Sequence, residues 1–180
     1  MNSLIIYGSQ YGTTKCYAEK LSEKTGIHMM NYEDVKDISD YETIIHLGGL
    51  YAGGVKGLKN TIKALPKNAN LIIATVGLAD IKDKENIDNI RKSISRQVPK
   101  EIYDKATIFH LRGGIDYKQL SLKHKTMMSL LYNKAKNLPE EKKTAEVRAM
   151  IVTYNQKVNF IDYDCLNQII ENIELVNSNL

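Results

Sequence analysis

Short apolar runs, separated by segments with helical spacing, constrain the fold of this chain more than any other feature. The runs are rich in Ile, Leu or Val and lack strict alternation, which is typical of strands buried on both faces of a parallel sheet. Four of them cover residues 4–7, 43–47, 70–76 and 107–111, and residues 27–31 form a weaker candidate strand.

The segments between the runs place apolar side chains on one side of a helix and carry signals for its ends. Gly26 and Pro66 fit as stops, and Asp162 fits as an N-terminal cap. Strands that alternate with helices predict an α/β fold, a doubly wound parallel five-stranded sheet with helices on both faces. In such sheets, ligands bind at the carboxyl ends of the strands. The predicted helices cover residues 13–25, 55–65, 87–98 and 162–176.

The alternation breaks between residues 113 and 154, where there is more chain than a loop needs. The stretch from Tyr117 to Leu138 contains five lysines, His124 and no acidic residue, with apolar residues at helical spacing. Residues 140–153, which follow Pro139, predict a further helix. We therefore expect one domain, residues 1–180, with a helical insertion over residues 113–154.

A loop of small and hydroxyl-bearing residues links the first strand to the first helix. Its glycines, Gly8 and Gly12, are separated by three residues, so it is not a Walker A loop, and G-x-G-x-x-G is absent. Backbone N–H groups and hydroxyls at the start of a helix can surround a phosphate. A capped turn without a ligand remains the alternative. The loop consists of Ser9, Gln10, Tyr11, Gly12, Thr13 and Thr14.

Two further loops follow the second and third long strands. The loop after the second long strand has four glycines in seven residues, which indicates close approach of the backbone to a flat or bulky ligand. Tyr51 in this loop is available to stack on such a ligand. A flexible turn with an incidental tyrosine is the alternative. In the third loop, Leu78 or Ile81 is a candidate cover for the other face of a ligand, and Asp80 is a candidate cap of the next turn. The candidate site residues here are Gly49, Leu50, Tyr51, Ala52, Gly53, Gly77, Leu78, Ala79 and Asp80.

Composition narrows the class of protein. A hydrophobic content of 43%, a charged content of 26% and a net charge of +4 indicate a soluble globular protein and give no argument for a nucleic-acid partner. No apolar run is long enough to span a bilayer and no signal peptide is evident, so we expect a cytoplasmic protein. The cysteines and histidines lack metal-ligand spacing; we expect reduced, packed thiols and packed, hydrogen-bonded His46 and His110.

The three loops, in this order on this sheet, resemble those of the flavodoxin superfamily. The first is similar to the flavin mononucleotide (FMN) phosphate loop, (S/T)-x-T-G-x-T, and matches it at Ser9, Gly12 and Thr14, while Tyr11 replaces a threonine. The resemblance implies FMN as cofactor, with the second and third loops beside the isoalloxazine ring and Tyr51 stacked on it. It also implies an electron-transfer protein or oxidoreductase, with a redox partner protein or a small-molecule or quinone acceptor.

The insertion resembles that of a narrower group, the flavodoxin-like, quinone-linked protoporphyrinogen dehydrogenases of haem synthesis. This resemblance makes porphyrinogen oxidation the alternative function. The lysines between Tyr117 and Leu138 suit an acidic partner, porphyrinogen carboxylates or peripheral contact with an anionic membrane, and a solvated lysine face is the plain alternative. A non-enzymatic receiver module of the same architecture would need acidic residues where this chain has Gly8-Ser9 and Gly48-Gly49.

Overall fold

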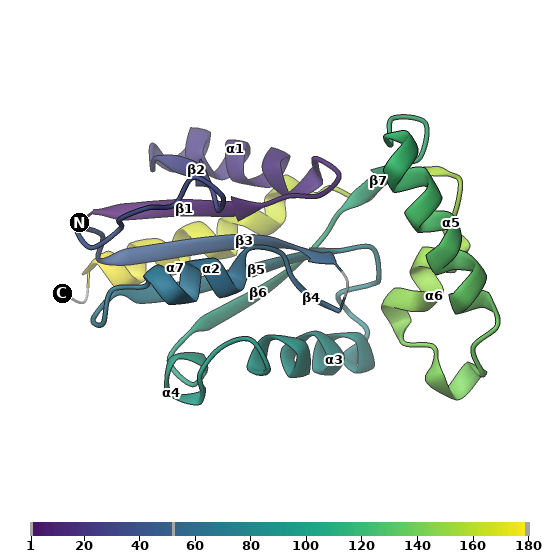
Figure 1. Cartoon of the computed structure of the whole chain (residues 1–180). Coiled ribbons are helices and arrows are strands. Elements are labelled where there is room, and N and C mark those ends of the chain that lie inside the picture. The colour runs from purple at the N-terminus through teal and green to yellow at the C-terminus, as the bar shows by residue number, and fades with distance from the viewer. Residues whose placement is uncertain (1, 52, 179–180) are drawn as a thin grey trace.

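The computed structural model describes residues 2–51 and 53–178. Its centre is a parallel sheet with the strand order β2-β1-β3-β5-β6, to which a short antiparallel strand, β4, adds at the end of β3 (Figure 1). The five expected parallel strands and the doubly wound fold are confirmed. The strands are β1 (Ser3–Gly8), β2 (Met29–Asn31), β3 (Thr43–Tyr51), β4 (Gly54–Val55), β5 (Asn70–Gly77) and β6 (Thr107–Arg112).

Helices cover both faces of the sheet because successive residues of each strand point to opposite sides. On one side, Ile5 of β1 belongs to a core that includes Leu21 and Leu166. On the other side, Leu4 shares a core with Leu58. The first face carries α1 (Thr13–Thr25) and α7 (Leu166–Ser178), and the second carries α2 (Leu58–Ala64), α3 (Lys84–Ser95) and the short α4 (Lys100–Tyr103).

Three predicted boundaries differ from the structure. The helix expected from residue 55 begins at Leu58, because Val55 pairs with Leu50 in β4. The next helix begins earlier than expected, at Lys84, because the Asp83 carboxylate caps it by accepting a hydrogen bond from the Asn86 N–H. Asp162 does act as a cap, but of a 3₁₀ turn, η2 (Tyr163–Cys165), that precedes α7.

The second predicted loop begins later than expected, because β3 continues through Gly48 and Gly49 to Tyr51. Gly48 lies where β4 folds back over β3, and a Cβ atom there would lie 2.2 Å from a Val55 methyl carbon. A side chain at this position would therefore prevent the pairing of β3 with β4. Gly48 is therefore needed within the strand itself. Among the four glycines of the second loop, only Gly53, which has a φ of +77°, has a left-handed backbone.

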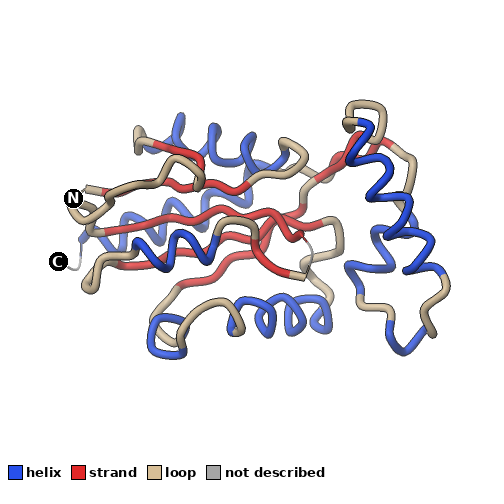
Figure 2. The backbone as a smooth tube through the Cα atoms, viewed as in Figure 1, coloured by secondary structure: helices blue, strands red, loops and turns tan. Residues whose placement is uncertain are grey.

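The insertion lies beyond the carboxyl ends of the parallel strands (Figures 1 and 2). Its two ends are joined by antiparallel pairing of β7 with β8, so it extends to Asn159 rather than stopping at residue 154. Its own core is centred on Ile115, Tyr117 and Met128, and Tyr11 of the first loop packs against it. The elements are β7 (Gly114–Asp116), α5 (Leu122–Lys136), η1 (Glu140–Lys142), α6 (Ala145–Val152) and β8 (Lys157–Asn159).

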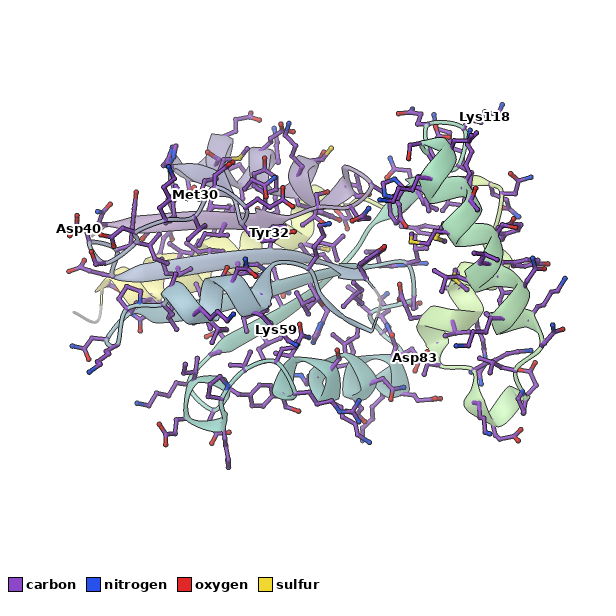
Figure 3. The ribbon with its side chains drawn as sticks, viewed as in Figure 1. Met30, Tyr32, Asp40, Lys59, Asp83 and Lys118 are labelled. Atoms are coloured by element: carbon purple, nitrogen blue, oxygen red, sulfur yellow. The ribbon has the colours of Figure 1, made fainter. Side chains whose placement is uncertain are left out.

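Helix α3 points its capped N-terminal end toward the insertion, as the position of Asp83 shows (Figure 3). Contacts between α3 and α6 join the two parts there. Across residues 2–51 and 53–178, no helix combines the length and the apolar character needed to cross a bilayer.

Candidate functional site

A cavity of about 450 Å³ lies at the carboxyl ends of the strands, between the sheet and the insertion. Its size falls within the range of roughly 300–1,000 Å³ that is usual for small-molecule sites. The three predicted loops form one wall, α3 contributes residues such as Asn89 and Lys92, and the insertion contributes residues such as Met128 and Met150. The structure therefore brings together, at one site, loops that are far apart in the sequence.

Most of the predicted site residues line this cavity. Ser9, Gly12, Ala79 and Asp80 do not contribute to the lining, and Ala52 lies outside the described residues. The predicted residues that line the cavity are Gln10, Tyr11, Thr13, Thr14, Gly49, Leu50, Tyr51, Gly53, Gly77 and Leu78.

The first loop turns sharply into α1. Gly12 has a φ of +90° and caps the helix without a side-chain hydrogen bond, and its own N–H donates to the Ser9 hydroxyl at 3.1 Å. Within the described part of the chain, the N–H groups of Thr13, Thr14 and Lys15 have no hydrogen-bond partner. Unpaired N–H groups and the helix dipole make such a helix start a site for an anion.

The two threonine hydroxyls at the start of α1 have different surroundings. Thr13 donates its hydroxyl to the carbonyl oxygen of Gly114, 2.8 Å away in β7. Thr14 is 3% exposed, and a Cβ atom on Gly49 would lie 3.1 Å from its hydroxyl oxygen. Thr13 therefore fastens the insertion to the first loop, whereas Thr14 lies where the first loop meets β3.

Polar contacts connect the first loop to the second loop and to the insertion. Lys56 donates to the side-chain carbonyl oxygen of Gln10, and the Gln10 amide nitrogen lies 2.6 Å from Nε2 of His124 in α5. The Lys56 ammonium also lies 5.6 Å from the centre of the Tyr51 ring. Tyr51 donates its hydroxyl to the sulfur of Met127 at 2.9 Å, so its ring is held between the two parts of the cavity wall.

The third loop meets a carboxylate that comes from the insertion. The N–H groups of Leu78 and Ala79 donate to the two carboxylate oxygens of Glu146, each at 3.0 Å. Arg112 donates to the carbonyl oxygen of Leu78 at 3.1 Å. Asp80 accepts a hydrogen bond from the Lys82 N–H, so it caps the following turn, which was the alternative role expected for it.

Tyr11 of the cavity wall and Tyr117 of the insertion core are neutral at physiological pH. Burial raises the pKa of Tyr11 to about 12, with smaller contributions from Tyr51 and Tyr117. Burial likewise raises the pKa of Tyr117 to about 12, and Tyr154 adds to the effect. The Tyr11 hydroxyl accordingly remains a donor, to the Met128 sulfur at 3.4 Å. This side of the site suits an apolar, uncharged ligand surface.

His46 and His110 serve the packing of the sheet. His46 is fully buried, and burial lowers its pKa to about 4. Its Nε2–H donates to the Lys56 carbonyl oxygen at 3.0 Å, because that oxygen can only accept, and its Nδ1 accepts from the Thr61 hydroxyl at 2.8 Å. Burial also lowers the pKa of His110 to about 4, and one of its ring nitrogens lies 2.8 Å from the Thr75 hydroxyl.

Neither metal ligands nor disulfides are found in the part of the chain that the structure describes. No group of three or more His, Cys, Asp or Glu side chains there could hold a metal ion. Cys16 and Cys165 are both free and partly buried.

The sequence prediction missed Lys56, His124 and Glu146. Lys56 directly follows the glycine-rich segment, so a cation at the end of that segment was a usable signal. Glu146 reaches the third loop across a separation of 67 to 68 residues, and nothing in the local pattern marks it. The sequence showed an insertion, but it did not show that this insertion forms a wall of the site.

The strand order, the helices on both faces and a cavity lined by loops at the carboxyl ends of the strands define an α/β protein of the flavodoxin-like class. The family model described as a Flavodoxin domain matches residues 4–142. The chain therefore belongs to the flavodoxin domain family.

Similar solved structures include a flavodoxin from Fusobacterium nucleatum bound to flavin mononucleotide, which is 17% identical. The match covers 63% of this chain and 71% of that one, with a TM-score of 0.43. A flavoprotein from Lactobacillus acidophilus NCFM in complex with FMN is 13% identical over 62% of this chain and 91% of that one, with a TM-score of 0.42. No curated protein matches the sequence.

Proposed function

We propose that this protein binds FMN in the cavity and acts as a redox protein, either an electron carrier or an oxidoreductase. The observation that carries the proposal is that a helix start with unpaired N–H groups, at Thr13 and Thr14, opens into the same cavity as Tyr51. Membership of the flavodoxin domain family supports it. When bound, FMN supplies the electron-transfer chemistry, and the protein supplies binding, orientation and electrostatics.

The phosphate fits the start of α1. The N–H groups of Thr13, Thr14 and Lys15 are donors without protein partners among the described residues, and the helix dipole favours a negative charge there. The Thr14 hydroxyl is a further donor in the cavity wall, and the Ser9 hydroxyl retains its proton because it accepts from the Gly12 N–H. These donors are neutral, so binding depends on their orientation rather than on a cationic side chain.

The ring fits the part of the cavity between the second loop, the third loop and the insertion. Tyr51 offers an aromatic face, while Leu78 and Met128 offer apolar surface in the same cavity. Tyr11, whose pKa is raised by burial, stays a protonated donor and carries no charge that would repel a ligand. The apolar core of the insertion adjoins this region, because Tyr11 and Leu78 both pack against it.

A second candidate is the oxidation of a bound small molecule, and the insertion is the observation that favours it. Residues such as Leu131 and Met150 extend the cavity wall with apolar surface, and Lys92 of α3 and Arg96 at its C-terminal cap add cations. Quinone-linked protoporphyrinogen oxidation is one specific form of this candidate, and it rests on the resemblance of the inserted sequence alone. Turnover of protoporphyrinogen by the intact, FMN-loaded protein would support it, and lack of turnover would remove it.

The first experiment is a titration of the purified protein with FMN, followed by visible absorption and by quenching of flavin fluorescence. We expect saturable binding to the wild type and weaker binding to Thr14→Ala, by roughly tenfold to 150-fold for one hydrogen bond to a charged group. A Thr126→Ala variant, altered on the outer side of α5, is the control. Absence of binding to the wild type would overturn the proposed function.

A further inference from the structure

We propose that Glu146 is an internal competitor for the flavin ring, holding the backbone donors of the third loop until FMN displaces it. The inference rests on the proposed function and specifies how its cofactor site is regulated. It assigns a role to a residue of the insertion, outside the three loops that resemble those of other flavodoxins. The side chain of Glu146 then occupies the backbone donors of the third loop, and binding of FMN requires this side chain to leave.

The contact is a paired one. Oε1 of Glu146 accepts from the Leu78 N–H and Oε2 accepts from the Ala79 N–H, each at 3.0 Å. Gly77 permits this approach, because a Cβ atom at Gly77 would lie 3.0 Å and 3.3 Å from the two carboxylate oxygens. Glu146 and Leu78 also line the cavity that we assign to FMN, so the hydrogen bond between them lies in the cavity wall.

The carboxylate and the ring present the same pattern to these donors. A carboxylate has two acceptor oxygens on one carbon, and the pyrimidine edge of the flavin has an acceptor nitrogen and a carbonyl oxygen on one carbon. Each backbone N–H supplies a single proton. Well-aligned hydrogen bonds from Leu78 and Ala79 to Glu146 therefore exclude equally good ones to the ring, and the two acceptors compete.

Glu146 can be displaced without leaving a buried charge behind. Within the described residues it forms no ion pair, and its oxygens are held by neutral backbone donors. It lies in the first turn of α6, a helix capped by Thr144 through the Val147 N–H, so the helix does not depend on the contact. A rotation of the flexible Glu146 side chain returns its charge to water, which solvates it well.

The test compares the affinity for FMN of the wild type, Glu146→Ala and Glu146→Gln, with Glu141→Ala as the matched control. Glu141 is an exposed carboxylate of the same insertion, so its removal changes the net charge equally without touching the third loop. If the donors are free in about one tenth of wild-type molecules, removal of the competitor lowers the apparent Kd about tenfold, or about 1.4 kcal/mol. We expect this gain for Glu146→Ala, a smaller gain for Glu146→Gln and no gain for Glu141→Ala.

Riboflavin, which lacks the phosphate, separates the ring contact from the phosphate contact. We expect Glu146→Ala to tighten riboflavin and FMN binding by the same factor, because the competition acts on the ring. If FMN binds but Glu146→Ala leaves its affinity unchanged or weakens it, Glu146 is not a competitor, and the inference is overturned while the proposed function stands. If neither the wild type nor any variant binds FMN, the proposed function itself fails.

Discussion

The Thr13 hydroxyl donates a hydrogen bond to the carbonyl oxygen of Gly114, and 2.8 Å separates the two oxygen atoms. Thr13 opens α1 in the first loop, and Gly114 opens β7 at the base of the insertion. A second contact lies nearby, because Tyr17 donates its hydroxyl to the Arg112 carbonyl oxygen at 2.7 Å. The helix start that we assign to the phosphate is thus also the anchor of the insertion.

We predict that Thr13→Val loosens the insertion. Valine keeps the shape of threonine but leaves the Gly114 carbonyl without its donor, at a cost of about 1 kcal/mol. Hydrogen exchange in β7 and β8 should become faster, while exchange in β1 and β5 stays unchanged. Thr126→Val, at the exposed hydroxyl of α5, is the control and should not alter β7. Equal exchange in Thr13→Val and the wild type would show that the insertion is held in place by its packing alone.

Gly12 and Gly26 provide a matched pair of substitutions at the two ends of α1. Their φ angles are +90° and +71°, and no atom lies within 4 Å of a Cβ added at either position, so alanine costs only backbone strain. We predict that each alanine variant loses roughly 1–2 kcal/mol of unfolding free energy in urea. Only Gly12→Ala should also weaken FMN binding, since it alters the phosphate loop. Equal loss of FMN affinity in both variants would argue against that loop as the phosphate site.

The fold and much of the site could be predicted from the sequence, because both depend on local patterns. Apolar runs mark buried strands directly, and the first loop carries its own signature at Ser9, Gly12 and Thr14. Contacts across long separations leave no such signal. Glu146 meets Leu78 through the path of the insertion, and β7 pairs with β8 over a stretch of chain that reads as helical.

The short strand β4 was missed for a different reason. Two residues, Gly54 and Val55, are too few to show a period, and the pairing depends on the fold-back that the glycines of β3 allow. The same fold-back places Lys56, whose carbonyl oxygen would lie 2.2 Å from a Cβ atom on Gly8. The glycines of the second loop were interpreted as sites of close approach to a flat or bulky ligand, but at Gly48 the approaching group is Val55 of the chain itself.

Tyr51 tests the assignment of the ring site. We predict that Tyr51→Phe keeps most of the affinity for FMN, because it loses only the hydrogen bond to Met127 and retains the aromatic face. Tyr51→Ala should weaken binding about tenfold, since aromatic stacking contributes about 0.5–1.5 kcal/mol beyond the burial of the ring. Tyr103→Ala, at the end of α4 and away from the cavity, is the control. Unchanged affinity in Tyr51→Ala would place the ring elsewhere.

His46 makes the stability of the fold depend on pH. Its pKa falls from 6.5 to about 4 on folding, so the unfolded chain binds a proton in this range and the folded chain does not. The stabilisation by neutral His46 is complete above about pH 6.5, decreases as the pH falls and is lost below about pH 4, a change of at most about 3 kcal/mol. In His46→Gln, the slope of unfolding free energy against pH between these values should be smaller. An unchanged slope would mean that other groups dominate acid unfolding.

The outer face of α5 predicts binding to anionic lipid. Leu122 is 83% exposed and Leu130 is 67% exposed, and α5 contains lysines but no acidic residue. Lys118 adds a further cation at the extremity of the insertion (Figure 3). Exposed leucines beside lysines suit a membrane surface, where each cation near anionic lipid contributes about 1 kcal/mol. We therefore expect sedimentation of the protein with vesicles rich in phosphatidylserine, but not with neutral vesicles.

Two variants separate membrane contact from a merely solvated lysine face. Leu122→Ser combined with Leu130→Ser should reduce vesicle binding at constant charge, because it removes the exposed apolar surface. Lys123→Gln combined with Lys134→Gln should reduce it most strongly at low salt, because screening already weakens the attraction at high salt. Both variants should bind FMN like the wild type, since these four side chains do not line the cavity. Equal binding to anionic and neutral vesicles, or no binding to either, would assign these lysines to solvation alone.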